Sequence, residues 1–252
     1  MNFSVVMPIH NEADMLPLSL PTVYHLVPSE VILIFDNCSD ASEQVAEKII
    51  SKYDPQHRIT VCINDVPTTI EHKERLSYLM RLGMDSAFYR VVLVTAADIM
   101  LDPEIRLFMS QITKFPFMSF DHVDYPVNWR TLVKRGLRFL PLWKDERLSG
   151  IYAVNLNVRA ECEDQEKVKS IELGEDTLMQ QCIQAKYPTK FFYVNNIHLR
   201  PKEDSDRQYR RGLSYWKTAK RGFFKTVVSA VISGRFCLIK GYIHARVGEK
   251  SF

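Results

Sequence analysis

Short apolar runs alternate with longer stretches of helical periodicity over the first hundred residues of the chain. The apolar runs, which are rich in β-branched residues, are residues 3–7, 31–35, 58–63 and 91–95. The stretches with helical spacing are residues 13–26, 42–53 and 71–88. Because strands that alternate with helices form βαβ units with right-handed crossovers, this order predicts an α/β fold with a mostly parallel central sheet flanked by helices.

The alternation becomes less regular after residue 98. Further strands are predicted at residues 117–125, 150–158 and 190–197, and further helices at residues 105–112, 128–139 and 176–185. Only helical patterns follow His198. We therefore expect one domain over residues 1–200, followed by a basic helical C-terminal extension over residues 201–252.

Polar side chains follow the predicted parallel strands, where ligands bind in sheets of this kind. They are Asn11, Glu12, Asp36, Asp40, Asn64, Asp65 and Asp98. Carboxylates at these positions can accept hydrogen bonds from a base edge or from ribose hydroxyls, and they can hold a divalent cation against a diphosphate. Helix capping or a local turn is the favoured interpretation for Asp40 and Asp65 alone, whereas the two interpretations are balanced for Asp36.

Glycine is scarce, and its placement excludes two classes of nucleotide site. The chain has 9 glycines in 252 residues, the first of them is Gly83, and no two lie closer than seven residues apart. Neither a G-x-G-x-x-G dinucleotide turn nor a G-x-x-x-x-G-K-[ST] phosphate loop can therefore occur. Any nucleotide chemistry here must use something other than a glycine-rich loop.

Two further groups of residues can carry chemistry. Residues 174–177 (GEDT) place two adjacent carboxylates at the start of a predicted helix, where the helix dipole favours an ionised general base, although a simple cap is the favoured interpretation of these four residues alone. His198 follows the strand predicted at residues 190–197, much as Asp98 follows its own strand. A lone histidine is more often a packing or surface residue, but a metal site shared by these two strand ends is an alternative.

Five segments occur in an order and at spacings that resemble one enzyme family. They are residues 5–12 (VVMPIHNE), residues 34–42 (IFDNCSDAS), residues 92–98 (VLVTAAD) with 101–104 (LDPE), Ser149-Gly150 with Gly174-Glu175-Asp176, and His198. The chain resembles the family 2 glycosyltransferases, which have the GT-A fold, over residues 3 to about 200. The resemblance implies a Rossmann-like nucleotide-binding half, an acceptor half, and transfer of a sugar from a nucleotide sugar with inversion.

The resemblance also implies roles for individual residues. The nucleotide pocket would be lined by Pro8, Ile9, His10, Asn11, Glu12, Asp36, Asp65, Ala97 and Asp98, with Glu12 near the ribose and Asp36 on the base. Asp98 and His198 would hold Mg²⁺ or Mn²⁺ on the diphosphate. Asp176 would be the general base, assisted by Glu175, and Ser149 and Gly150 would lie by the acceptor or donor sugar. Two departures are Ala96, where the family's D-x-D motif has its first Asp, and His10, where Tyr or Phe is usual.

The expected activity is a metal-dependent, hexosyltransferase-type reaction. The donor would be a UDP-sugar, with a GDP-sugar as the alternative, and the acceptor a hydroxyl of a saccharide or of a lipid-linked molecule. Loss of catalysis through Ala96 would instead leave a module that binds nucleotides or membranes, and a retaining transferase of the same fold is a further alternative. A sugar-phosphate nucleotidyltransferase ranks lower, because residues 10–14 (HNEAD) lack the glycine-rich, basic first loop of those enzymes.

The net charge of +3 conceals an uneven distribution. Residues 198–252 contain 13 Lys or Arg and 4 Asp or Glu, a net charge of +9, so that the rest of the chain has −6. Helical apolar spacing in this tail fits either a cap packed on the first domain or a surface helix on an anionic membrane. Charge with aromatic residues also fits nucleic acid, but nothing else supports it and we expect none.

The compartment is inferred from cysteines and from apolar segments. The five cysteines are scattered without a C-x-x-C motif, which favours reduced thiols over a disulfide framework or a zinc ribbon. We expect no signal peptide and no membrane span, because the first residues lack the required basic and apolar regions and no window approaches about 18 apolar residues. The expected location is cytoplasmic, with peripheral association at the cytoplasmic membrane face as an option.

Overall fold

The computed structural model describes residues 1–64, 66–67, 72–125, 132–133, 136, 150–162, 182–199, 209, 223–233 and 236–248. The chain forms two compact units, one of Met1–His122 with Arg147–Leu199 and one of Val123–Glu146 with Arg200–Phe252. The border between them falls inside strand β6, whose last two residues are described with the strand. Each unit is described by itself.

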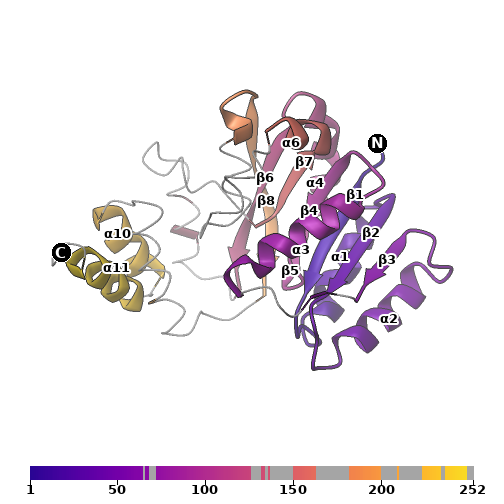
Figure 1. The fold of residues 1–252 in the computed structure, drawn as a ribbon, viewed down its shortest axis with the longest axis horizontal. Helices are drawn as coiled ribbons and strands as arrows, with labels where there is room; N and C mark the ends of the chain where they lie inside the picture. Colours follow the sequence, from indigo (N-terminus) through magenta and orange to yellow (C-terminus); the bar gives the residue numbers. More distant parts are fainter. Residues whose placement is uncertain are drawn as a thin grey trace. The chain divides into compact units, whose positions relative to one another are not determined.

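Four parallel strands form the first half of the sheet. They are β1 (Ser4–Ile9), β2 (Glu30–Phe35), β3 (Thr60–Ile63) and β4 (Val91–Val94), and they lie in the order β3-β2-β1-β4 (Figure 1). Helices α1 (Leu16–His25), α2 (Ser42–Tyr53) and α3 (His72–Ser86) connect them. The predicted βαβ organisation is confirmed, and α2 has the predicted bounds.

Alternate residues of these strands face two different hydrophobic clusters. Val5, Met7 and Ile9 of β1 pack with buried residues of α1 and α2. Val6 points the other way and packs with buried residues of α3. The sheet is therefore covered by helices on both faces, which explains why its strands read as continuous apolar runs rather than as alternating ones.

The second half of the sheet is antiparallel where its pairing is defined. It contains β5 (Ile99–Met100), β6 (Phe117–Asp124), β7 (Tyr152–Asn155) and β8 (Thr189–His198), which complete the order β3-β2-β1-β4-β7-β6-β8-β5. Strand β7 pairs antiparallel with β4 and with β6, and β5 pairs antiparallel with β8. The chain is thus an α/β protein with an eight-stranded sheet, in which the first four strands pair in parallel.

Several predicted boundaries were wrong, among them those of β1, α1 and β7. Strand β1 continues through Pro8 to Ile9, because the side on which Pro8 lacks an N–H faces β4, whose pairing with β1 ends at Val6. Helix α1 begins at Leu16 rather than at residue 13, after a turn over residues 13–15. Strand β7 ends at Asn155, whose side-chain oxygen accepts a hydrogen bond from the N–H of Asn157 at 3.1 Å, and helix α6 (Leu156–Cys162) replaces the rest of the predicted strand.

Two other segments complete the first unit. The helix predicted over residues 105–112 is α4 (Ile105–Met109) with a 3-10 turn at Ser110–Thr113. The helices predicted over residues 128–139 and 176–185 lie largely outside the described residues.

The second unit contains a pair of described helices, α10 (Phe223–Ser233) and α11 (Phe236–Gly248). They pack through buried Ala230, Leu238 and Tyr242, and the rings of Phe223 and Tyr242 are 5.9 Å apart. Among the described helices of the chain, none combines the length and apolar character that a membrane span requires.

Candidate functional site

The strand order creates a switch point beside β1. The chain leaves β1 toward β2 and β3 and then crosses to the other side of β1 to form β4. In open α/β sheets, ligands bind at the carboxyl ends of the strands where the order reverses in this way. Pro8 and Ile9 end β1 at this point, and Ala97 and Asp98 follow β4. The structure therefore brings the predicted nucleotide residues of β1 and β4 to one edge of the sheet.

Hydrogen bonds join the loop after β1 to the loop after β2. Asn11 has a left-handed backbone with φ of 54°, a conformation that Asn tolerates better than most residues. Its side-chain oxygen accepts hydrogen bonds from the N–H of Ser39 at 2.8 Å and from the Ser39 hydroxyl at 3.2 Å. The N–H of Glu12 donates to the Ser42 hydroxyl at 2.7 Å. Asparagine thus makes a tight turn here without the help of glycine.

Asp40 organises the same pair of loops. One carboxylate oxygen accepts hydrogen bonds from the N–H of Ser42 at 3.0 Å and from its hydroxyl at 2.5 Å. The other oxygen accepts one from the N–H of Ala13 at 3.0 Å. These bonds confirm the structural interpretation of Asp40, at the start of α2. Asp65, for which the same interpretation was favoured, lies outside the described residues.

Asp36 lies at the end of β2 and is held by an arginine that the sequence analysis missed. Asp36 is 4% exposed. The Nε of Arg75 in α3 lies 2.7 and 2.8 Å from its two carboxylate oxygens. An Nη2 N–H of Arg75 also donates to this carboxylate, and Asn37 donates to it at 3.3 Å. Burial by itself would raise the pKa of Asp36, but the hydrogen bonds from Arg75 and Asn37 outweigh it and lower the pKa below 3.8.

A signal for Arg75 is present in the sequence. Arg75 lies four residues before Leu79, which is buried against the sheet, so the two share one face of α3. Arg75 lies in the first turn of α3, one turn before this apolar stripe, and a crossover helix begins near the carboxyl ends of the strands. A positively charged side chain at this place can therefore reach those strand ends. His10 adds a second contact, because its Nδ1 lies 2.6 Å from the backbone oxygen of Asp36.

Asp98 and His198 are in contact although 100 residues separate them. The contact depends on β5, whose Ile99 pairs with His198, and on the hydrogen bond from the N–H of Leu199 to the Asp98 carbonyl at 2.8 Å. The His198 Nε2 lies 3.2 Å from a carboxylate oxygen of Asp98. The Asp98 side chain is 9% exposed and that of His198 is 29% exposed. The structure thus brings together the two residues expected to hold a cation.

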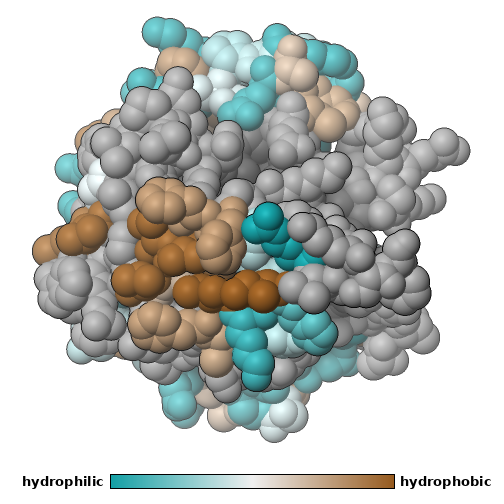
Figure 2. Space-filling view, turned by 90° about the vertical axis from the view of Figure 1, so that its left-hand side faces the viewer, coloured by the Kyte–Doolittle hydropathy of each residue, from teal (hydrophilic) through white to brown (hydrophobic). Residues whose placement is uncertain are grey.

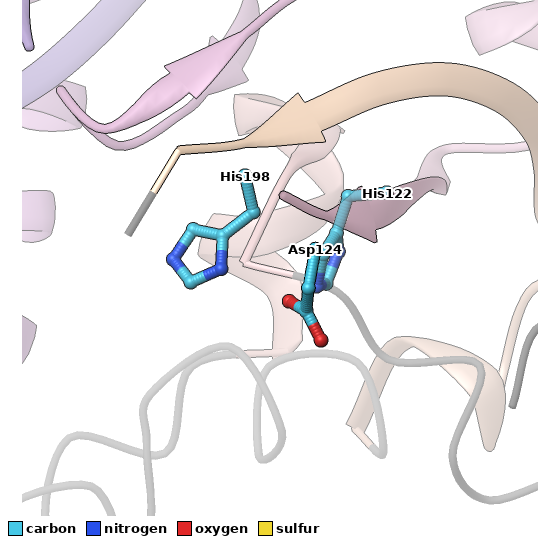
Figure 3. A group of neighbouring side chains, drawn as sticks. All are labelled: His122, Asp124 and His198. Carbon is cyan, nitrogen blue, oxygen red and sulfur yellow. The ribbon is translucent and has the colours of Figure 1, made fainter. Parts of the chain in front are cut away.

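Two further potential ligands, which the sequence analysis missed, lie beside His198 (Figure 3). The ligand atoms of His122, Asp124 and His198 all lie within 4.8 Å of one another, a group that could hold a metal ion. The rings of His122 and His198 meet edge to face at 5.7 Å. The available signal was the H-x-D spacing in β6, because residues two apart on a strand share a face.

The acceptor side of the expected site is largely outside the described residues. Ser149, Glu175 and Asp176 fall there, so their expected roles stay predictions. Gly150 is described: it is exposed, lies in a bend before β7, and has open space where a Cβ would project.

Comparisons with known proteins identify the fold. No protein-family model and no curated protein matches the sequence. Solved structures do match. S. aureus TarS (residues 1–349) has a TM-score of 0.55 and 14% identity, over 93% of this chain and 71% of that one. The chain has the GT-A glycosyltransferase fold.

Two other structures of this fold match over most of the chain. Mycobacterium tuberculosis glucosyl-3-phosphoglycerate synthase, in complex with Mn²⁺, UDP and phosphoglyceric acid, has a TM-score of 0.53 and 15% identity, over 82% of this chain and 72% of that one. The mannosyltransferase PcManGT of Pyrobaculum calidifontis, in complex with GDP-Man and Mn²⁺, has a TM-score of 0.60 and 14% identity. The match covers 96% of this chain and 70% of that one.

Proposed function

We propose that the protein is a metal-dependent glycosyltransferase that moves a sugar from a nucleoside-diphosphate sugar to an acceptor hydroxyl with inversion. The observation that carries the proposal is the pair of carboxylates at the carboxyl ends of the parallel strands. Asp36 is paired with Arg75 at the end of β2, and Asp98 is paired with His198 after β4. The first pair suits a nucleobase and the second suits a cation bound to a diphosphate. The GT-A fold supports the same assignment.

The Asp36–Arg75 pair offers an acceptor and a donor side by side. Uracil presents an N–H next to a carbonyl oxygen, so the carboxylate can accept from the base while the guanidinium donates to it. Arg75 has five N–H donors, and the structure uses one each from Nε and Nη2 on Asp36 and one from Nη1 on the Pro67 carbonyl. Guanine presents the same pattern, whereas adenine presents the reverse. We therefore favour a UDP-sugar, with a GDP-sugar as the alternative.

Asp98 and His198 provide the chemistry of a divalent cation site. Carboxylate oxygens suit Mg²⁺ and Mn²⁺, and an imidazole shifts the preference toward Mn²⁺. A cation held there would neutralise the charge that develops on the leaving diphosphate. Ala96, which replaces the first acidic residue of the family motif, packs partly buried against the core, so this position adds no ligand.

Asp176 is the proposed general base, with Glu175 beside it. This assignment rests on the family resemblance of residues 174–176, as does the inverting stereochemistry, and Ser149 with Gly150 is assigned to the acceptor or donor sugar on the same basis. A base within hydrogen-bond reach of the acceptor hydroxyl would accept its proton as the hydroxyl oxygen attacks the anomeric carbon.

A membrane-bound acceptor is the second part of the proposal. Exposed apolar side chains of α10 and α11 include Phe224, Val231 and Phe236, which are 79%, 51% and 62% exposed, and Figure 2 shows apolar surface gathered over these helices. The segment from His198 to Phe252 has a net charge of +9. Aromatic side chains beside cationic ones favour an anionic lipid surface. Peripheral binding there would place the enzyme on the membrane that carries a lipid-linked acceptor.

Thermal shift with nucleotides and Mn²⁺ tests the donor. We expect a larger stabilisation by UDP or GDP than by ADP, because adenine reverses the donor and acceptor pattern while the diphosphate is common to all three. Equal shifts with all three would contradict base recognition by Asp36 and Arg75. No shift with any nucleotide or nucleotide sugar would contradict the transferase itself.

Turnover and vesicle binding test the rest of the proposal. Asp176→Asn should abolish turnover without changing UDP binding; unchanged turnover would make the base assignment wrong. UDP binding without turnover of any sugar in a donor panel would favour the catalytically impaired module. Vesicles that contain anionic lipid should bind the protein at low salt and release it at high salt, and failure to bind would favour a structural role for the tail.

A further inference from the structure

The end of strand β6 presents two metal-binding side chains on one face. His122 and Asp124 are two residues apart, and both are half-buried, whereas the intervening Val123 and the preceding Asp121 are buried. This alternation is that of a strand with one face toward the core and one toward solvent. His122 and Asp124 therefore project together from the partly exposed face.

Strand β8 brings a third ligand to the same place. β8 lies next to β6 in the sheet, and His198 is its last residue. Figure 3 shows the side chains of all three residues gathered at the ends of the two strands. Ligands bound about 2.1 Å from one ion lie roughly 3 to 4 Å apart, and the ligand atoms of this group are already within 4.8 Å of one another. Small side-chain rotations would bring them to one cation.

We propose that His122, Asp124 and His198 hold a divalent cation, with Asp98 in contact with the Nε2 of His198, and that the two imidazoles give this site a preference for Mn²⁺ or Zn²⁺ over Mg²⁺. His198 links the two sets, because it contacts Asp98 on one side and lies in the group with His122 and Asp124 on the other. Nitrogen ligands suit borderline transition metals, whereas Mg²⁺ takes oxygen ligands.

This site also offers an explanation for Ala96. The usual motif supplies two acidic residues from one strand end, and here one of them is absent. Asp124 would provide a second carboxylate from a different strand. The inference rests on the proposed function only in that the cation would serve the donor diphosphate; the ligand set itself is testable with the metal alone.

The experiment measures Mn²⁺, Zn²⁺ and Mg²⁺ binding to the full chain by calorimetry without nucleotide, with Mn²⁺ also followed by electron paramagnetic resonance. Removal of an outer-shell partner already weakens metal binding roughly 10-fold or more, so His122→Gln and Asp124→Asn should each weaken Mn²⁺ binding by at least ~10-fold. The matched control is His57→Gln, which removes an exposed imidazole that lies 3.3 Å from the carboxylate of Glu47. It should bind Mn²⁺ like the parent protein.

The variants distinguish this proposal from a cation site made of Asp98 and His198 alone. Wild-type affinity for Mn²⁺ in both His122→Gln and Asp124→Asn, together with loss in Asp98→Asn, would overturn it and leave a site of Asp98 and His198. Tighter binding of Mg²⁺ than of Mn²⁺ would overturn it as well. His122→Asn serves as a second substitution if a urea midpoint shows that the glutamine variant is unfolded. Absence of a UDP-induced thermal shift bears on the proposed function alone, because metal binding is measured without nucleotide.

Discussion

Replacement of Arg75 by methionine would remove the guanidinium that holds the Asp36 carboxylate. Exposed ion pairs contribute about 0–1 kcal/mol, whereas loss of one partner from a buried pair costs about 3–5 kcal/mol because the remaining charge is uncompensated. The side chains of Asp36 and Arg75 are 6% and 16% exposed, which lies nearer the buried case. For Arg75→Met we therefore expect a loss of about 2 kcal/mol in the free energy of unfolding.

The dependence of this loss on pH follows from the lowered pKa of Asp36. A carboxyl whose folded pKa lies below its unfolded value of 3.8 stabilises the fold above that value, and the contribution disappears as the pH falls through the folded pKa. The difference between wild type and Arg75→Met should thus be full at pH 7 and should shrink below about pH 4. In the variant, burial without the guanidinium should raise the pKa of Asp36.

Urea unfolding followed by circular dichroism, at pH 7 and at pH 3, measures these differences. The double variant Asp36→Asn/Arg75→Met should be more stable than the sum of the single changes predicts, by about 1–2 kcal/mol, because it leaves no unpaired carboxylate. Arg75→Met should also lose the thermal shift with UDP. A loss below about 0.5 kcal/mol, with an unchanged UDP shift, would refute both the buried pair and its role in base recognition.

Three further predictions concern packing, backbone and alkaline pH. Gly83→Ala should cost about 1–3 kcal/mol in urea unfolding, because a Cβ there would lie 2.3 Å from a methyl of Val6; Gly136→Ala, with open space around it, is the control, and equal effects would contradict the close approach of α3. Asn11→Gly should cost about 1 kcal/mol through lost side-chain hydrogen bonds, and Asn11→Ala about 1 kcal/mol more through its left-handed backbone; equal stability of the two variants would argue against that strain. Burial raises the pKa of Tyr24 to about 12, so stability should fall as the pH rises from about 10 through 12, where unfolded tyrosine ionises first. Tyr24→Phe should reduce that fall, and an unchanged pH profile in the variant would exclude Tyr24 as its source.

Local sequence pattern was sufficient to predict the parallel half of the fold. Each strand from β1 to β4 has its own apolar run, the first three are each followed by a helical pattern, and the bounds of α2 matched those expected. Asp36 and Asp98 were candidates because they follow such strands. Their proximity to one sheet edge follows from topology alone, since the carboxyl ends of parallel strands meet there.

Local pattern could indicate Arg75 and His122 as candidates, but it could not show which side chains they contact. Strand β5 has only two residues and exists because β8 pairs with it, so nothing in the sequence around Ile99 predicts it. Arg75 lies 39 residues from Asp36, and its direction depends on how α3 is rotated on the sheet. His122 is similar: its place beside His198 depends on β8 lying between β6 and β5.

The insertion of β8 between β6 and β5 also has a consequence for the order of folding. The strands β1 to β4 are joined by short crossovers and lie within the first 94 residues, whereas the Asp98–His198 contact closes a loop of 100 residues. Long loops are closed late, after local units have formed. We expect amides of β1 and β2 to gain protection from hydrogen exchange before those of β5 and β8 in a pulsed refolding experiment. A nascent chain would then acquire the Asp36–Arg75 pair early, and the Asp98–His198 contact only once residue 198 has left the ribosome.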